Sequence, residues 1–292
     1  MRLGTIEAGG TKIICGIGDE NGQLGKKATI PTLHPRDTIP EILGFFASNK
    51  VEALGIGTFG PVEIDPASPQ YGMITSTPKE GWRNFDLLGA LKAQIDVPMV
   101  LDTDVNAAVL AESRWGAAKG LDNSVYITVG TGIGAGILAQ GRLVHGLLHP
   151  EVGHMLIRRH PDDSFIGNCP YHHDCAEGIA AGPAIAKRWG KPGIELTHEE
   201  AVWDLEAFYL AQVIANLLLV LSTQKVILGG GVMGQKTLFP KIRHEVTRLL
   251  NGYIDKKAIT ENMHDLIVAP GLGSDAGLKG GLALIVNQRA GK

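Results

Sequence analysis

Alternating hydrophobic and polar positions at the start of the chain predict short β-strands. Residues 1–31 contain three apolar segments, RLGTIE, TKIICGIG and LGKKATIP, separated by the turn-forming stretches AGG and ENGQ. After Thr11, the side chains of Ile13, Cys15 and Ile17 alternate with a second set, as in a strand with two different faces. We therefore expect a β-hairpin in this region.

The rest of the chain alternates helical patterns with short apolar strands. Helices are expected at about residues 37–49, 84–94, 177–189, 197–221 and 236–251, and one more begins within TDVNAA near residue 104. Apolar strands are expected within residues 51–61, 97–101, 123–146, 225–231 and 265–271, while residues 63–82 read as irregular. Strands that alternate with helices indicate an α/β fold with a sheet covered on both faces.

Two segments repeat the same strand, glycine turn and strand pattern. EAGGTKIICGIG and TVGTGIGAGILA place Thr11 and Thr131 at equivalent points, 120 positions apart (131 − 11 = 120). Two similar βββαβα halves explain this repeat. We expect one lobe from residues 1–119 and a second from residues 120–274, with a loop at 149–177 in the second. A helix at about residues 275–292 is expected to return to the first lobe.

Composition narrows the class of protein. With 292 residues, of which 44% are hydrophobic, the chain can form two ordinary cores. A net charge of −3 and the lack of a basic tract argue against a nucleic-acid partner. No signal-peptide pattern is visible, and the apolar run at residues 213–221 is too short to cross a bilayer. We expect a cytoplasmic protein without a membrane partner.

Cysteine and histidine residues cluster in the 149–177 loop. Cys169, His172 and Cys175 have the spacing C-x-x-H-x-x-C, and His154 lies 15 positions before the first of them (169 − 154 = 15). Two thiolates and two imidazoles are a donor set that tetrahedral Zn²⁺ accepts. Four protein ligands leave no position for water, so a structural zinc is expected. His173 and His160 are alternatives for the histidine ligands.

Two glutamates lie at the ends of this loop. Glu151 and Glu177 flank the predicted zinc ligands. Carboxylates beside a rigid metal site are candidates for binding a polyhydroxylated ligand. They can equally be solvated surface acids, and the pattern alone does not decide between the two.

Four glycine-rich turns at expected strand ends indicate nucleotide binding. AGGTK, VGTGIGAG, LGGGVMG and PGLGSDAG can each bring backbone N–H groups close to phosphate oxygens. GGGVMGQKT misses the Walker A spacing by one position. GTGIGA is followed by a strand, and no second strand with a ribose-binding acid follows GLGSDA, so a dinucleotide fold is disfavoured.

The segment DTDVNAA places Asp104 after a buried strand and at the start of a helix. Asp is a common helix N-cap, which is one interpretation of this residue. A carboxylate at the carboxyl end of a strand is also well placed to act as a general base on a hydroxyl. We favour Asp104 over Asp102 for that role.

These motifs together resemble the ROK family of ATP-dependent sugar kinases. The resemblance rests on GGTK, TDVNA, GTGIGAG, E-V-G-H and the Cys/His cluster, covers essentially the whole chain, and is closest to the bacterial zinc-containing fructokinase branch. It implies an actin-like ATPase (ribonuclease H-like) fold, with two lobes that close on sugar and ATP, and a homodimer. The implied substrates and metals are ATP with Mg²⁺, fructose phosphorylated at its 6-hydroxyl, and a structural Zn²⁺.

The resemblance also implies roles for individual residues. Asp104 corresponds to the catalytic base. The positions that contact the sugar are Gly60, Thr103, Asp104, Glu151, His154 and Glu177, and His154 then serves both metal and sugar. The positions that bind the nucleotide are Gly9, Gly10, Thr11, Lys12, Thr131, Gly132, Gly134, Gly182, Pro183, Gly229, Gly230 and Gly231.

Three departures from the family pattern bear on the sugar. Glu7 stands where the first loop usually has Asp, Thr103 where the glucokinase branch has Asn, and His172 where the metal site usually has Cys. They favour fructose over glucose, with mannose, glucose and N-acetylmannosamine as alternatives. A sugar-sensing repressor would need a DNA-binding segment ahead of residue 7, and a zinc hydrolase would need the spacing H-E-x-x-H, which HPEVGH lacks.

Overall fold

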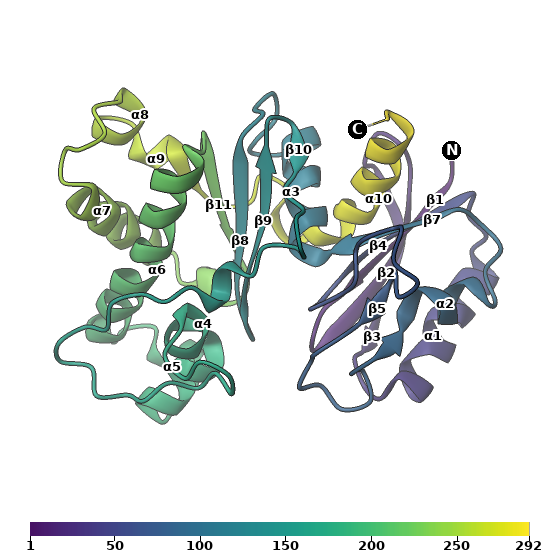
Figure 1. Ribbon diagram of the computed structural model, residues 1–292, viewed down its shortest axis with the longest axis horizontal. Coiled ribbons are helices and arrows are strands. Elements are labelled where there is room, and N and C mark those ends of the chain that lie inside the picture. The colour runs from purple at the N-terminus through teal and green to yellow at the C-terminus, as the bar shows by residue number, and fades with distance from the viewer. Residues whose placement is uncertain (292) are drawn as a thin grey trace. The chain divides into compact units, whose positions relative to one another are not determined.

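The computed structural model describes residues 1–291, which divide into two compact units (Figure 1). The first unit consists of Met1–Gly120, Arg142–Pro150 and residues 271–291, and the second of Leu121–Gly141 and Glu151–Pro270. The predicted 120–274 lobe therefore differs from the second unit at Arg142–Pro150 and after Pro270. The last residue of the predicted 275–292 helix lies outside the described residues.

The sheet of the first unit has the strand order β3-β2-β1-β4-β7. Its strands are β1 (Leu3–Ala8), β2 (Lys12–Gly18), β3 (Leu24–Pro31), β4 (Ala53–Thr58) and β7 (Met99–Thr103). β1, β2 and β3 are antiparallel neighbours, whereas β1, β4 and β7 run parallel. Ala8, Thr58 and Thr103 lie opposite one another in register, so three parallel strands end at one edge of the sheet.

Helices cover both faces of this sheet (Figure 1). On one face, α1 (Pro35–Ser48) and α2 (Leu87–Lys92) contribute to a large apolar core. On the other, α3 (Asp104–Trp115) packs against α10 (Ala276–Arg289). A Cβ at Gly55 would lie 1.9 Å from the Gly281 carbonyl oxygen, so two glycines allow α10 to lie directly on β4. Two-residue strands β5 (Met73–Ile74) and β6 (Phe85–Asp86) pair beside this core.

The sheet of the second unit repeats the arrangement of the first. Its strands β8 (Ser124–Val129), β9 (Ile133–Ala139), β11 (Lys225–Gly229) and β12 (Ile267–Val268) have the order β9-β8-β11-β12, as β2-β1-β4-β7 in the first unit. β8 and β9 are antiparallel, while β8, β11 and β12 are parallel. The predicted α/β class is confirmed, and both units contain the strand, glycine turn and strand pattern.

The long helix α6 (Glu200–Leu221) forms the core of the second unit. It packs against α4 (Ala176–Ala180) and α7 (Leu238–Leu250), while α8 (Lys257–Thr260) and α9 (Met263–Leu266) follow α7. Its length and mean hydropathy of 1.6 would suit a membrane span, but 61% of its most apolar stretch is buried inside the protein. That degree of burial is typical of a core helix.

The helix predicted at 177–189 is broken into α4 and α5 (Gly182–Trp189). Ala181 is extended, with φ −75° and ψ 160°, because Pro183 follows within the first turn of α5 and favours a new helix start over continuation. The helix predicted from residue 197 begins at Glu200, after the 3₁₀ turn Gly193–Leu196. The predicted 84–94 helix is shorter because Phe85 and Asp86 form strand β6.

Candidate functional site

Three loops meet at the strand edge of the first unit. Residues 9–11 follow β1, residues 59–61 follow β4, and α3 follows β7 directly. The Phe59 N–H donates to the Ala8 carbonyl oxygen at 2.7 Å, which ties the second loop to the end of β1. The Gly9 N–H donates to the Lys12 carbonyl oxygen at 3.0 Å and closes a tight turn. Ligands of open α/β sheets bind at such an edge.

Asp104 is the first residue of α3, and Thr103 caps the helix. The Thr103 Oγ1 accepts from the Asn106 N–H at 3.1 Å, so the N-cap interpretation of Asp104 is wrong. The Asp104 Oδ1 accepts from the Val105 N–H at 2.9 Å, which restrains its carboxylate. A Cβ at Gly57 would lie 3.2 Å from the Asp104 Cα, so the bare glycine lets the helix start approach β4. Thr103 itself is buried, with its hydroxyl at the helix cap.

Asp102 occupies a different environment from Asp104. It is buried, its Oδ1 accepts from the Thr103 N–H and the Asn106 Nδ2, and its Oδ2 lies 2.9 Å from the His145 Nε2. Both oxygens of Asp102 are thus occupied by protein donors. This arrangement favours Asp104 as the base of the pair.

Glu7, at the end of β1, is a second carboxyl group near Asp104. Burial, together with the negative charge of Asp104, raises the pKa of Glu7 to about 7, although Lys12 opposes the shift. A Cβ at Gly277 would lie 2.3 Å from the Glu7 Oε1, so this carboxyl lies against the first turn of α10. Its Oε2 is buried without a hydrogen-bond partner in the described part of the chain. A buried acceptor without a donor fits a cation or a bound ligand.

The Glu7→Gln variant is expected to be more stable than the wild type at pH 8 and equally stable near pH 4. The folded-state pKa of Glu7 is raised above its ordinary value of 4.5, so ionisation opposes folding and wild-type stability falls as pH rises from about 4.5 to about 7, above which the loss is complete. The expected gain in unfolding free energy at pH 8 is about 2 kcal/mol, measured by urea denaturation. Glu80→Gln, at an exposed position, is the control. An equal gain at both pH values would contradict the assignment.

In the second unit, Glu151 and Glu177 lie near each other. Burial among surrounding protein atoms and the nearby Glu177 raise the pKa of Glu151 to about 7, although the residue keeps an accessible face. The Glu177 Oε2 accepts from the Ile133 N–H at 3.0 Å. A Cβ at Gly132 would lie 2.5 Å from that oxygen, so Glu177 also borders the glycine turn between β8 and β9. Both glutamates are thus part of one polar group, and Glu177 is not a solvated surface acid.

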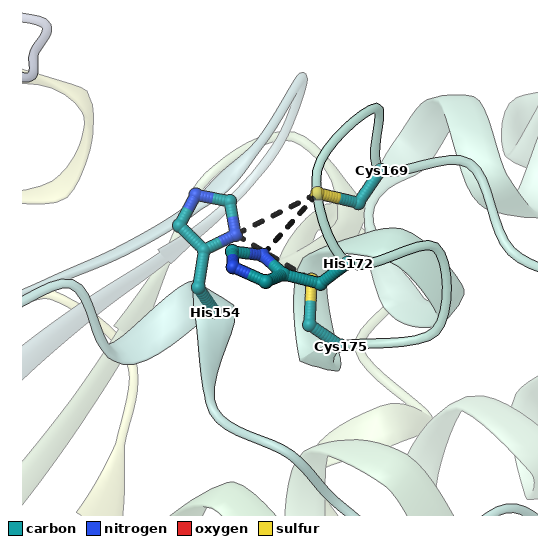
Figure 2. Close-up of side chains that lie close together, drawn as sticks. All are labelled: His154, Cys169, His172 and Cys175. Carbon is teal, nitrogen blue, oxygen red and sulfur yellow. Dashed lines mark hydrogen bonds between the residues drawn. The ribbon is translucent and has the colours of Figure 1, made fainter. Parts of the chain in front are cut away.

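The four predicted zinc ligands converge (Figure 2). His154 lies on the 3₁₀ turn Val152–His154, Cys175 is the N-cap of α4, and Cys169 and His172 lie on the loop before it. Their donor atoms all lie within 4.8 Å of one another. The His173 backbone pairs with Cys169 in both directions, so the peptide groups hold the loop closed.

Three of the distances between these donor atoms are compatible with one tetrahedral ion. The His154 Nδ1 lies 3.4 Å from the Cys175 Sγ and 3.8 Å from the Cys169 Sγ, and the His172 Nδ1 lies 3.7 Å from the Cys169 Sγ. Zinc bonds of about 2.3 Å to sulfur and about 2.0 Å to nitrogen separate such atoms by about 3.5 Å. The histidine rings point toward the two thiols in Figure 2. Neither His173 nor His160 belongs to this group of described residues.

A cavity of about 650 Å³ lies beside the glycine turns of the second unit. Gly130, Thr131, Gly182, Pro183 and Gly231 line it, and four of these are predicted nucleotide positions. The Gly182 N–H donates to the Gly130 carbonyl oxygen at 2.8 Å, so the break before α5 joins the turn after β8. Further lining residues that the sequence did not single out are Ile185, Pro192, Gly193, Ile194, Thr197, Trp203, Val232, Gly234 and Gln235.

Other predicted nucleotide residues lie outside this lining. Gly230 has a φ of +90°, and a Cβ there would lie 2.3 Å from the Val129 carbonyl oxygen, so only glycine fits. Gly229 ends β11, Gly134 pairs with Thr128 within the sheet, and Gly132 contacts Glu177. The remaining positions lie in the first unit, where Gly9, Gly10 and Thr11 form the turn after β1 and Lys12 begins β2.

A larger cavity of about 810 Å³ in the second unit contains none of the predicted catalytic, sugar or nucleotide positions, although His160, the alternative metal ligand, lines it. The Arg188 and Asp163 side chains at its wall form a bidentate ion pair, with the Arg188 Nη2 3.1 Å from the Asp163 Oδ2. The Arg188 guanidinium also lies over the Phe165 ring. Because these charged groups already satisfy each other, volume alone does not make this cavity the site of the chemistry.

Comparison with known proteins identifies the family of the chain. The ROK family model matches residues 3–288. A fructokinase of Pediococcus pentosaceus is 47% identical over 284 residues, covering 97% of each chain, and a fructokinase of Zymomonas mobilis is 41% identical over 290 residues, covering 96% of this chain and 95% of that one. The crystal structure of a ROK family glucokinase from Streptomyces griseus in complex with glucose and AMPPNP is 25% identical, with a TM-score of 0.78 over 99% of this chain and 100% of that chain.

Proposed function

Because the chain belongs to the ROK family, we propose that it is a fructokinase that transfers the γ-phosphoryl group of ATP to the 6-hydroxyl of fructose. The observation that carries the proposal is the identity of 47% and 41%, over nearly the whole chain, to two proteins named fructokinases. The fold of the ROK glucokinase from Streptomyces griseus, together with the related sheets of the two units, supports the actin-like ATPase architecture expected for such a kinase.

Asp104 is the proposed general base. Phosphoryl transfer needs little covalent work from the protein, so alignment and charge neutralisation carry most of the catalysis. The Asp104 carboxylate accepts the proton of the attacking hydroxyl, while its bond from the Val105 N–H restrains its direction. Asp102, whose two oxygens already accept hydrogen bonds from protein donors, takes no part in proton transfer.

Each unit has residues that we assign to sugar binding, and the second unit also has a cavity that we assign to ATP. In the first unit, Gly60, Thr103 and Asp104 follow the parallel strands, although the Thr103 hydroxyl is buried at the helix cap. In the second unit, Glu151, His154 and Glu177 present two carboxylates and an imidazole, which suit the hydroxyl groups of a sugar. The 650 Å³ cavity, with its glycine turns and apolar walls, suits the adenosine part of ATP.

Two metal ions belong to the proposal. His154, Cys169, His172 and Cys175 would hold a structural Zn²⁺, whose role is to fix the loop that carries Glu151 and Glu177. A Mg²⁺ ion bound with ATP would supply neutralisation of phosphate charge. Glu7, whose Oε2 has no hydrogen-bond partner among the described residues, would hold it in the first unit.

Other hexoses are the alternative substrates. The Streptomyces griseus glucokinase was crystallised in complex with glucose, so a glucose site can be built on this fold. Thr103, in place of the Asn of the glucokinase branch, carries no amide to offer a hexose, and its hydroxyl is held at the helix cap. We also propose a cytoplasmic homodimer, as expected for this family.

The purified protein is expected to release ADP fastest with fructose. A coupled assay of ADP release with ATP and Mg²⁺ should be run on fructose, mannose, glucose and N-acetylmannosamine. We expect kcat/KM for fructose to exceed that for glucose by at least about 10-fold, a ratio that one or two differing hydrogen bonds produce. The product, separated and tested with an isomerase that accepts fructose 6-phosphate, identifies the phosphorylated hydroxyl. If kcat/KM is higher for glucose than for fructose, glucose is the preferred substrate and the protein is still a sugar kinase.

A further inference from the structure

The buried Asp102 is an acidic side chain that the proposed reaction does not use. It is 4% exposed and lies two residues before the proposed base. Its Oδ1 accepts from the Thr103 N–H and the Asn106 Nδ2, each at 2.7 Å, and its Oδ2 lies 2.9 Å from the His145 Nε2. An ionised carboxylate is costly to bury unless donors or a cation compensate it. The buried Asp102 carboxylate is therefore stabilised by these donors.

His145 is the partner of Asp102 that can carry a positive charge. The Thr103 N–H and the Asn106 amide are neutral donors, whereas an imidazole can be protonated. The hydrogen bond that His145 donates to Asp102 raises the pKa of His145, although burial opposes the shift. His145 belongs to the segment Arg142–Pro150, which is far from α3 in sequence but belongs to the same unit. The ion pair thus fastens that segment to the junction of β7 and α3.

The hydrogen bonds of Asp102 enclose the residues on both sides of Asp104. Asp102 holds the Thr103 backbone and the Asn106 side chain, and the Thr103 Oγ1 accepts from the Asn106 N–H at 3.1 Å. Asp104 lies in sequence between Thr103 and Asn106, so the orientation of its carboxylate depends on these hydrogen bonds. A small displacement of a catalytic group lowers turnover strongly, because the reacting atoms must be in line.

We propose that His145 is a positioning residue for phosphoryl transfer: as an imidazolium paired with Asp102, it holds the β7–α3 junction so that Asp104 is aimed at the acceptor hydroxyl. This inference rests on the proposed function of Asp104 as the base. His145 touches neither substrate nor reacting atoms in this account and acts through Asp102.

The surroundings of the pair determine its pH dependence. The Tyr71 hydroxyl, bonded to the Leu101 backbone, lies near Asp102, and burial raises the pKa of Tyr71. Burial lowers the pKa of His149, whose Nε2 accepts from the Val62 N–H at 3.2 Å, so this ring is neutral. The charges of Asp102 and, more weakly, Glu63 oppose that shift in the pKa of His149, whereas His145 adds to it. His145 is therefore the cation of this group of described residues, and the ion pair is lost as pH rises through its raised pKa.

The test compares His145→Gln, His145→Ala and Asp102→Asn with the wild type, using saturating fructose and ATP across a pH series. Turnover of the three variants is expected to fall on the order of 10- to 100-fold, while the KM for ATP is unchanged. The wild-type decline of kcat at alkaline pH should disappear in His145→Gln, because that side chain donates a hydrogen bond but does not titrate. The turnover of the double variant His145→Gln/Asp102→Asn should be no lower than that of either single variant, because both substitutions remove the same ion pair.

A matched control distinguishes positioning from a general loss of histidine. His264 forms an exposed pair with Asp265, with 3.5 Å between Nε2 and Oδ2, and His264→Gln should keep wild-type kcat at every pH. If His145→Gln loses thermal stability but keeps the wild-type pH profile, the pair is a structural fastening and the proposal is wrong. If the His145 and Asp102 variants phosphorylate fructose with wild-type kcat, His145 is not a positioning residue, and the proposed function is unaffected. A wild-type protein inactive on all four sugars overturns both.

Discussion

The Asp104→Asn variant is expected to fold normally and to lose about 10²- to 10⁴-fold in turnover, the usual cost of removing a general base. Asparagine has the same shape as aspartate, and its Oδ1 can still accept from the Val105 N–H, so the start of α3 should be unchanged. The amide cannot take the proton of the attacking hydroxyl. Steady-state kinetics with fructose and ATP, calorimetric fructose binding and thermal melting together separate the chemical step from binding and folding.

Asp96→Asn is the control for that experiment, because Asp96 is an exposed aspartate outside the strand edge. It should keep wild-type turnover. If Asp104→Asn retains turnover within a factor of about 3, no general base has been removed and another carboxylate must accept the proton. A large loss of fructose binding with little loss of kcat would instead make Asp104 a sugar-binding residue.

Loss of a zinc ligand should destabilise the second unit and weaken fructose binding. The wild type is expected to contain one zinc per chain by elemental analysis, and Cys175→Ser to contain none. Cys175 is the N-cap of α4 and is completely buried, so its loss frees both the loop and the start of that helix. The expected fall in unfolding free energy exceeds about 4 kcal/mol, as for other losses of a structural metal.

The KM for fructose should rise more than the dissociation constant of an ATP analogue, on the order of 10-fold against a few-fold. His154 and Glu151 belong to one turn, so the metal orders the sugar-binding side chains before the sugar arrives. Nucleotide binding should weaken to a smaller extent, because Gly182 follows α4 closely and lines the cavity. Cys15→Ala, at a buried thiol of the first unit, should keep the zinc. Unchanged thermal stability after chelation, or equal weakening of both ligands, would contradict this account.

The elements that depend on local patterns were predictable from the sequence. The apolar strands that became β1, β4 and β8 and the glycine turns after them follow from alternation and from turn chemistry. The metal cluster followed from the spacing of Cys169, His172 and Cys175, since ligands of one loop must be close together.

Features that depend on distant residues were not predictable. His145 and Asp102 are 43 positions apart, and no local pattern joins a histidine of one loop to the end of β7. The capping role of Thr103 in place of Asp104 depends on a one-residue shift of the helix start, which periodicity does not resolve. Gly182 and Pro183 indicate the helix break at Ala181. The hydrogen bond from the Gly182 N–H to the Gly130 carbonyl oxygen could not be predicted, because it joins residues far apart in sequence.

The return of the chain end to the first unit has a consequence for synthesis on the ribosome. α10 packs on β1, β4 and α3, so the first unit lacks one covering helix until residues 276–289 have left the exit tunnel. The second unit has all of its residues once Pro270 has emerged. Nascent chains should therefore complete the second unit first, reversing the usual N-terminal priority. Until residues 276–289 emerge, the apolar face of the first sheet needs protection, which makes nascent chains stalled before residue 276 good substrates for chaperones.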